Sequence, residues 1–213
     1  MLSGESYKIK KQLNKSNFKN SVINLNVNEF SNNIQKINFK NEKVTENQIS
    51  NMSNIHKSLL IAKNQCNDLI YFVEDDYIHL RETFNEMILS YERISTQLNK
   101  ELVLCPIDYP YLYTKIVPSN IFLGSNKHWR RVEETLCTFC TSKILIDKYW
   151  SKFVAMCQFE HYPFEQPLHE IYKLEYCLSP IPSLAIHCTN INSIFGLSPN
   201  VDWKKIWEDS KDY

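Results

Sequence analysis

The chain has 213 residues, of which 43% are hydrophobic, and its 24 basic side chains balance its 24 acidic ones. This length and apolar content fit a single domain, 1–213, with a real hydrophobic core. A net charge of zero argues against a nucleic-acid partner, which would require a basic excess. The three scattered glycines exclude the glycine-rich loops that cradle phosphate.

The charge is divided unevenly along the chain. Residues 1–67 carry ten Lys and four Glu, whereas residues 68–213 carry more acidic than basic side chains. No run of about 18 apolar residues predicts a membrane span, and the start of the chain lacks the apolar stretch of a signal peptide. The seven cysteines are odd in number and fit reduced, buried thiols. We expect a cytoplasmic protein, with peripheral association at the inner membrane face as the alternative.

The first predicted elements lead from a basic segment into a buried strand. Residues 1–45 are rich in Asn and Lys and predict irregular structure or an edge strand, the latter at 22–27 where polar and apolar residues alternate. Residues 45–67 carry apolar side chains at spacings of three and four, which predicts an amphipathic helix. Residues 68–74 are a continuous β-branched and aromatic run, typical of a strand buried on both faces.

A second helix and strand follow at 84–94 and 101–105, and strand, helix and strand at this spacing predict a βαβ unit. An aromatic loop at 106–118 comes next, followed by two antiparallel strands at 120–124 and 135–141 that the basic link 127–131 joins. A helix at 142–157, which Ser142 caps, precedes a short helix that ends near 175. The chain continues with an extended run that ends at 185–187 and closes with a terminal helix at 199–213.

Three consecutive acids, Glu74, Asp75 and Asp76, close the first buried strand. Neighbouring carboxylates repel, and each raises the pKa of the others unless a cation neutralises them. The carboxyl edge of an open α/β sheet is also where ligands bind. A divalent cation held by these oxygens would remove the repulsion and offer a positive face to a diphosphate. The alternative is a solvated strand end in which Asp76 caps the next helix.

The segment DLIYFVEDDY, with a helix before it and a helix after it, resembles the acidic motif of nucleotide-sugar glycosyltransferases with the GT-A fold, particularly family 2-like bacterial enzymes. The order of elements continues the likeness, with FEQPLHE at 164–170 and PSLAIH at 182–187. The resemblance covers about residues 45–190. It implies an α/β fold with a GT-A-like mixed, mainly parallel central sheet flanked by helices.

The resemblance also implies roles for the acids and for one histidine. Asp76 would be the direct metal ligand, and Asp75 would support the metal or bind the nucleotide ribose. Glu74 would contact the ribose or hydrogen-bond to a group that binds the metal. His187 would be a further ligand of the metal or the diphosphate, which imidazole chemistry permits. A lone His after an apolar run is equally typical of a core residue. The implied cofactor is a divalent metal, Mn²⁺ or Mg²⁺.

Glu165 is the candidate catalytic residue. An inverting transfer needs a carboxylate that removes the proton from the acceptor hydroxyl while the nucleotide diphosphate leaves. The alternative is an acid in the first turn of a helix, where the helix dipole favours negative charge. Glu160, Glu133 and Glu134 are rivals for the same role.

Arg130 and Arg131 are candidates for binding the donor, next to His128 and Trp129. Guanidinium groups pair bidentately with phosphate, and an indole offers a face on which a sugar can stack. The alternative is a solvated hairpin end. The tyrosines of the 106–118 loop fit either an acceptor surface or an aromatic loop folded onto the core.

The sequence therefore predicts a metal-dependent transferase that moves a sugar from a nucleotide-sugar donor to a saccharide or lipid-linked acceptor. Two alternatives stay open, a non-catalytic GT-A-like binding domain and a metal-dependent phosphodiesterase. The neutral charge and the absence of a Lys near the acids disfavour the phosphodiesterase. In enzymes of the GT-A fold, on the order of a hundred residues usually precede the acidic motif, whereas only 73 residues precede Glu74. Three explanations stay open: a shortened domain, a fragment, or a module whose nucleotide pocket is completed by a second chain as partner.

Overall fold

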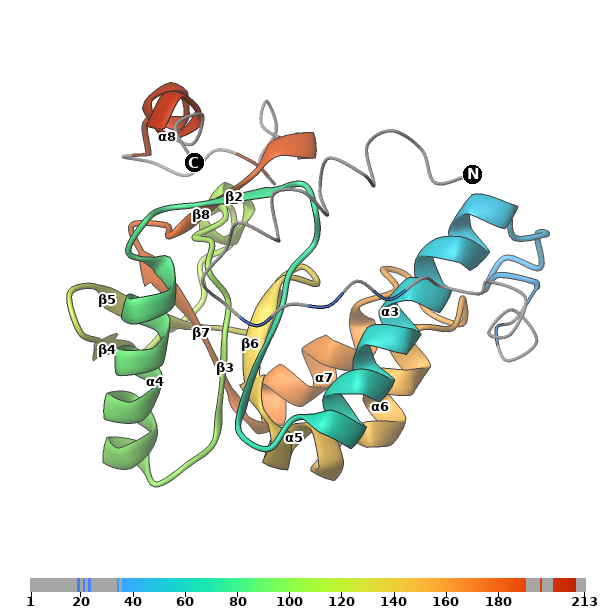
Figure 1. Ribbon diagram of the computed structural model, residues 1–213, viewed down its shortest axis with the longest axis horizontal. Helices are drawn as coiled ribbons and strands as arrows, with labels where there is room; N and C mark the ends of the chain where they lie inside the picture. Colours follow the sequence, from blue (N-terminus) through green and yellow to red (C-terminus); the bar gives the residue numbers. More distant parts are fainter. Residues whose placement is uncertain are drawn as a thin grey trace.

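The computed structural model describes residues 36–190 and 201–209, together with the single positions 19, 21, 23, 34 and 196. Within this part the protein is a mixed α/β fold with a six-stranded sheet, a two-stranded sheet and six α-helices (Figure 1). Most of the basic segment 1–45, including all of the suggested edge strand at 22–27 except residue 23, lies outside the described residues.

The bounds of the elements come in chain order. The helices are α3 (Glu46–Gln65), α4 (Thr83–Leu98), α5 (Lys143–Lys148), α6 (Trp150–Met156), α7 (Gln166–Leu174) and α8 (Trp203–Asp209). The strands are β1 (Leu69–Phe72), β2 (Tyr77–His79), β3 (Leu102–Leu104), β4 (Ile121–Leu123), β5 (His128–Val132), β6 (Phe139–Ser142), β7 (Tyr176–Ile181) and β8 (Ala185–His187). Short 3₁₀ turns occupy Pro110–Tyr113 and Cys188–Asn190. Helix α8 lies within the predicted range 199–213.

Local capping signals explain where two helices begin. Thr45 caps α3, because its hydroxyl accepts from the Gln48 amide while the Gln48 side chain accepts from the Thr45 amide. Ser142 caps α5, because its hydroxyl accepts from the Leu145 amide at 3.2 Å. The predicted single helix at 142–157 is interrupted at Tyr149, whose backbone (φ −112°, ψ 25°) separates α5 from α6.

The expectation of a mainly parallel sheet is wrong. The strands run in the order β1-β6-β3-β7-β5-β4, and only β3 and β7 pair in parallel. Strands β1 and β3 do run in the same direction, but β6 lies between them and is antiparallel to both. A strand–helix–strand pattern fixes the relative direction of its two strands, and it does not reveal a later strand that inserts between them.

The predicted pairing of 120–124 with 135–141 is also wrong. Strand β4 pairs with β5, which is formed by the segment interpreted as a basic link, and β6 pairs with β1 and β3 instead. In β5 the exposed His128 is followed by Trp129, which is fully buried. Two charged residues in a row follow Trp129, so the alternation of polar and apolar residues that would predict this strand is interrupted.

The six-stranded sheet separates two apolar layers. Helix α4 packs Met87, Tyr91 and Ile94 on one face, against β3, β5 and β7. Helices α3, α5, α6 and α7 cover the other face (Figure 1). The small sheet of β2 and β8 stands beyond the end of β1 and carries α8 close to β2. The three acids lie in the connection between β1 and β2, so the pairing of each strand within its own sheet holds both ends of that connection in place.

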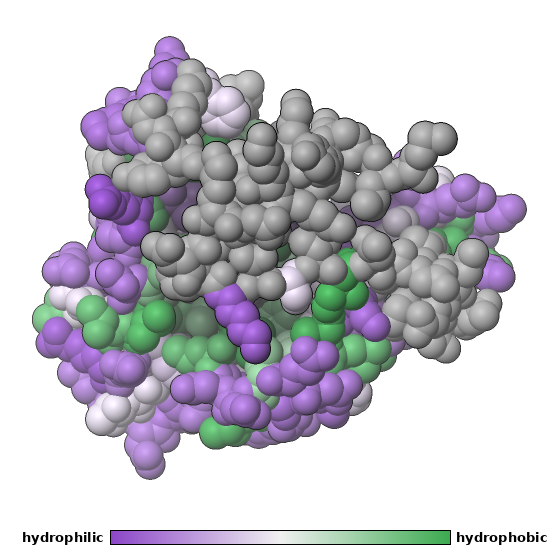
Figure 2. All heavy atoms as spheres, viewed as in Figure 1, coloured by the Kyte–Doolittle hydropathy of each residue, from purple (hydrophilic) through white to green (hydrophobic). Residues whose placement is uncertain are grey.

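Among the described residues on the face drawn in Figure 2, hydrophilic side chains predominate. Hydrophilic side chains cover its two flanks, and hydrophobic side chains gather in its lower middle. Helix α4 exposes Phe84, Ile88 and Leu89. Of the helices in the described part of the chain, none is both long enough and apolar enough to cross a lipid bilayer.

Candidate functional site

The structure brings Asp76 and His187 into direct contact, although they lie far apart in the sequence. The distance from His187 Nε2 to Asp76 Oδ2 is 2.9 Å. Strands β2 and β8 produce this contact, because Tyr77 lies opposite His187 in their register. The Cys188 amide also donates to the Asp76 carbonyl at 2.8 Å. Backbone pairing therefore holds the two candidate metal ligands side by side.

The His187 ring is held in one orientation. It stacks on the ring of Tyr77, with centroids 4.7 Å apart and an interplanar angle of 15°. The hydroxyls of Tyr77 and Tyr109 are hydrogen-bonded at 2.7 Å, which ties this stack to the core. Thr189 donates its hydroxyl to the same Asp76 oxygen at 2.5 Å. Both His187 and Tyr77 are buried, so the imidazole cannot turn away from Asp76 without disturbing the core.

Asp76 and His187 suit two neighbouring positions around a divalent cation. For metal–ligand distances of about 2.1 Å, adjacent ligands of an octahedral ion lie about 3 Å apart, and the two atoms are 2.9 Å apart. Within the described residues, no group of three or more His, Cys, Asp or Glu side chains could hold a metal ion. Mg²⁺ commonly uses one or two carboxylates and completes its shell with water and substrate phosphates. In the structure these two atoms are hydrogen-bonded to one another, so a cation would have to replace that contact and take its remaining ligands from water and substrate.

Glu74 is a carboxyl group with a strongly raised pKa. Burial is the main cause, and the negative charges of Asp76, Glu165 and Asp75 add to it, so that the pKa rises to about 7. The Glu74 amide donates to the Thr138 hydroxyl at 3.1 Å, which fixes the strand end. The negative charges of Asp75 and Asp76 thus add to the effect of burial on the pKa of Glu74, and a cation at Asp76 would reduce that contribution.

Glu165 lies at the start of α7 and faces the same buried region as Glu74. Its residue is 7% exposed, and burial raises its pKa. Its side chain makes no capping hydrogen bond to α7, but its position as the N-cap residue also suits the alternative of an acid favoured by the helix dipole. Beyond burial, the charges of both Glu165 and Glu74 raise the pKa of the Cys137 thiol. The two carboxyl groups thus lie close to one another around Cys137.

The three rival acids are placed differently from Glu165. Glu134 forms an ion pair with Lys115 at 3.1 Å, with both side chains well exposed. Glu133 and Glu160 are exposed. Burial next to the acid triple therefore separates Glu165 from its rivals.

Arg130 and Arg131 are bound to other groups. Arg130 Nη2 lies 2.7 Å from Asp108 Oδ1 in a buried ion pair, and its guanidinium lies 4.0 Å from the centroid of the Tyr113 ring. Arg131 lies on the opposite side of β5, with its guanidinium 4.7 Å from the centroid of the Tyr176 ring. Neither set of contacts reaches the acid triple, so the structure does not bring the arginines to Asp76.

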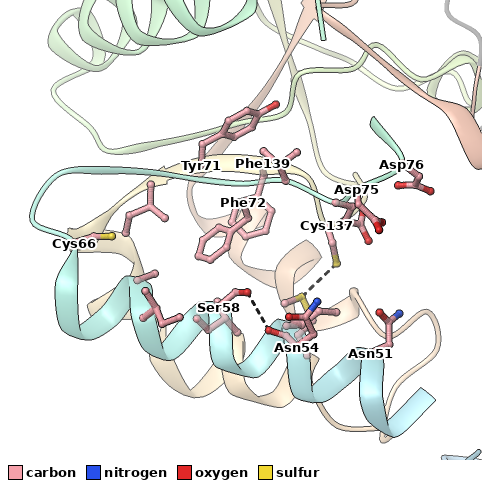
Figure 3. A pocket seen from close by; sticks show the side chains of 18 residues that line it. Asn51, Asn54, Ser58, Cys66, Tyr71, Phe72, Asp75, Asp76, Cys137 and Phe139 are labelled. Atoms are coloured by element: carbon pink, nitrogen blue, oxygen red, sulfur yellow. Dashed lines mark hydrogen bonds between the residues drawn. The ribbon is translucent and has the colours of Figure 1, made fainter. Parts of the chain in front are cut away.

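A cavity of about 710 Å³ lies between α3 and β1 and ends at the acid triple (Figure 3). Ligand pockets commonly enclose about 300–1,000 Å³. Helix α3 contributes Asn51, Asn54 and Ser58 to one side, while the rings of Phe72 from β1 and Phe139 from β6 lie on the other. Asp75 and Asp76 stand at the end nearest Asn51 (Figure 3). The cavity thus combines an apolar wall, amide groups and carboxylates.

Three of these features were missed by the sequence reasoning. Thr189 binds Asp76 and Tyr77 supports His187, but both contacts depend on the pairing of β2 with β8. The amides of Asn51 and Asn54 lie on the polar side of a helix, where Asn is ordinary. Their position three residues apart places them on one side of the helix and is the signal that was available.

No protein-family model matches the chain, and neither a curated protein nor a solved structure matches it. The likeness to glycosyltransferases therefore rests on the acidic segment and on the order of elements at 45–190. The geometry of Asp76, His187, Glu74 and Glu165 is independent of that likeness.

Proposed function

We propose that the protein is a nucleotide-sugar glycosyltransferase that uses a divalent metal, Mn²⁺ or Mg²⁺, and a saccharide or lipid-linked acceptor. The observation that carries the proposal is the contact between Asp76 and His187 at the end of a buried strand, beside a cavity that can accept a nucleoside. A carboxylate and an imidazole held 2.9 Å apart make a ready site for a cation that meets a diphosphate.

The donor has a natural place in this arrangement. Its diphosphate would lie at Asp76 and His187, and its nucleoside in the cavity between α3 and β1. The amides of Asn51 and Asn54 can donate and accept hydrogen bonds with the polar edge of a base, while the apolar wall packs on its face. A bound divalent cation would supply the charge that stabilises the departing diphosphate.

Glu165 is the proposed general base. Burial raises its pKa, and a carboxylate with a raised pKa removes a hydroxyl proton more readily than an exposed one. Its low exposure also limits the access of water that would compete with the acceptor hydroxyl. Glu74, whose pKa is about 7, would be ionised more fully once a positive charge neutralises Asp76.

The test combines binding with turnover. The purified chain is incubated with a panel of nucleotide sugars, Mn²⁺ or Mg²⁺, and saccharide acceptors, and thermal stabilisation and release of nucleoside diphosphate are measured. We expect both signals with at least one donor, and their loss in Asp76→Asn. The matched control is Asp68→Asn, which changes an exposed aspartate at the other end of β1 and should behave like the wild type.

The other outcomes identify the alternatives. Donor binding without release of nucleoside diphosphate, with every acceptor, would indicate a binding domain. Metal-dependent hydrolysis of bis-p-nitrophenyl phosphate without any response to nucleotide sugars would indicate a phosphodiesterase. Metal-dependent sugar transfer that is unchanged in Asp76→Asn would refute the proposed site.

A further inference from the structure

A second cavity, of about 540 Å³, lies between β5 and the loop that follows β3. We call it the Tyr113 pocket, and its walls include Tyr111, Tyr113, Arg130, Glu133 and Glu134. Its volume is within the range of about 300–1,000 Å³ that is usual for ligand sites. The pocket is distinct from the cavity between α3 and β1, with which it shares no lining residue.

The charges around the Tyr113 pocket are balanced. Lys115 and Arg130 line it together with the carboxylates of Glu133 and Glu134, and the buried carboxylate of Asp108 is the ion-pair partner of Arg130. The guanidinium of Arg131 lies over the Tyr176 ring on the other side of β5. Such a pocket has no excess of positive charge to attract a phosphate or a carboxylate. It offers planar donors and acceptors side by side, which is the pattern that sugar hydroxyls require because each hydroxyl both donates and accepts.

Tyr113 supplies a rigid aromatic face. Its hydroxyl donates to Asp108 at 2.5 Å, and the Arg130 guanidinium lies over its ring. These two contacts hold the hydroxyl and one face of the ring, and Tyr113 is still 53% exposed. Because the ring is already held in place, its side chain loses little conformational entropy when a ligand packs on it. Arg130 also has an Nε atom that is buried and makes no hydrogen bond with the described residues.

A chain of tyrosines connects the Tyr113 pocket to the acid triple. Tyr111 lines the pocket, and its ring centroid lies 5.5 Å from that of Tyr109. Tyr109 in turn is hydrogen-bonded to Tyr77, which follows Asp76 directly. Burial is the main reason that the pKa of Tyr111 is raised, and the carboxylates of Glu134 and Glu165 contribute to the rise. Tyr111 therefore lies within electrostatic reach of both the pocket and the proposed general base.

We propose that the Tyr113 pocket binds one sugar residue of an uncharged saccharide, with the Tyr113 ring as its stacking face and the exposed Lys115–Glu134 pair as its hydrogen-bonding partner. The further step of identifying this saccharide as the acceptor of the transfer rests on the proposed function. The binding itself needs neither donor nor metal, so it is measured separately.

The experiment is saturation-transfer NMR on the full chain in EDTA, without a donor. The probes are the methyl glycosides of glucose, galactose, mannose and N-acetylglucosamine, with methyl glucuronide and glucose 6-phosphate as anionic counterparts. We expect at least one neutral glycoside to bind, and Tyr113→Ala to weaken that binding about tenfold, the loss expected for one aromatic stacking contact. Tyr162→Ala, which removes a 78% exposed tyrosine outside the pocket, is the matched control.

Circular dichroism and thermal unfolding establish that each variant is folded. Three results would overturn the inference: no neutral glycoside binds, Tyr113→Ala binds as tightly as the wild type, or the anionic probes bind more tightly than the neutral ones. Asp76→Asn should bind the glycoside normally. A chain that binds glycosides in this way but fails to use any nucleotide sugar would overturn the proposed function and leave the pocket assignment standing.

Discussion

Replacing Glu74 by Gln should make the protein more stable at alkaline pH. The folded protein holds the Glu74 proton up to a pKa of about 7, whereas the ordinary value is 4.5. Between these two pH values the unfolded chain releases the proton and the folded chain retains it. The folded state therefore binds more protons, and the free energy of unfolding falls as the pH rises through this interval.

The size of the effect follows from that interval. A difference of about 2.5 in pKa corresponds to about 3 kcal/mol at about 1.36 kcal/mol per pH unit. Because Glu74 is only partly buried, solvent screening reduces the expected loss to about 2 kcal/mol. Glutamine has no proton to lose, so Glu74→Gln should match the wild type near pH 4.5 and exceed its free energy of unfolding by about 2 kcal/mol at pH 8.

The assay is urea unfolding in EDTA at intervals from pH 4.5 to pH 8. Glu133→Gln, which neutralises an exposed carboxylate, is the control and should follow the wild-type profile. Adding Mn²⁺ to the wild type at pH 8 should recover part of the lost stability, because a cation at the acid triple neutralises the same repulsion. A constant difference between Glu74→Gln and the wild type over this pH range would refute the reasoning.

Three further changes test the fold and the proposed chemistry. Glu86 is 2% exposed, and its carboxylate accepts hydrogen bonds from Ser90 at 2.7 Å and from Trp129 at 3.2 Å. Glu86→Ala should therefore lower the free energy of unfolding, measured in urea, by about 3 kcal/mol. A loss below about 1 kcal/mol would contradict this structure. A Cβ at Gly124 would overlap the Trp129 indole and the Ser90 hydroxyl, so Gly124→Ala should lower the urea midpoint, and an unchanged midpoint would show that the packing is looser than described. Glu165→Gln should retain nucleotide-sugar binding and lose about 100-fold or more in turnover, whereas unchanged turnover would remove Glu165 from the role of general base.

The helices and most of the strands could be predicted because their signals are local. The apolar spacing of 45–67 predicts α3, and the Ser142 cap predicts the start of α5, within a few residues. Strand pairing could not be predicted in the same way, because it depends on contacts between distant segments. The insertion of β6 between β1 and β3 is one case, and the strand that contains Arg130 and Arg131 is another.

The candidate site shows the same division. The acid triple at the end of β1 is visible in the sequence as a charge cluster, whereas the burial that chiefly raises the pKa of Glu74 depends on the fold. The contact of Asp76 with His187 depends on the β2–β8 pairing, which no spacing in the sequence reveals. Arg130 was assigned to the donor on its chemistry, and its buried partner Asp108 escaped notice because a single acid in an aromatic loop carries no pattern.

The most direct test of the central claim is calorimetric titration of the wild type and Asp76→Asn with UDP, GDP and dTDP, with and without Mn²⁺. We predict that the wild type binds at least one of these nucleotides only when the metal is present, and that Asp76→Asn loses this binding while Asp68→Asn keeps it. Nucleotide binding by Asp76→Asn with the same affinity and metal dependence as the wild type, or no metal-dependent binding of any nucleotide by the wild type, would contradict the assignment of Asp76 and His187 as the metal and diphosphate site.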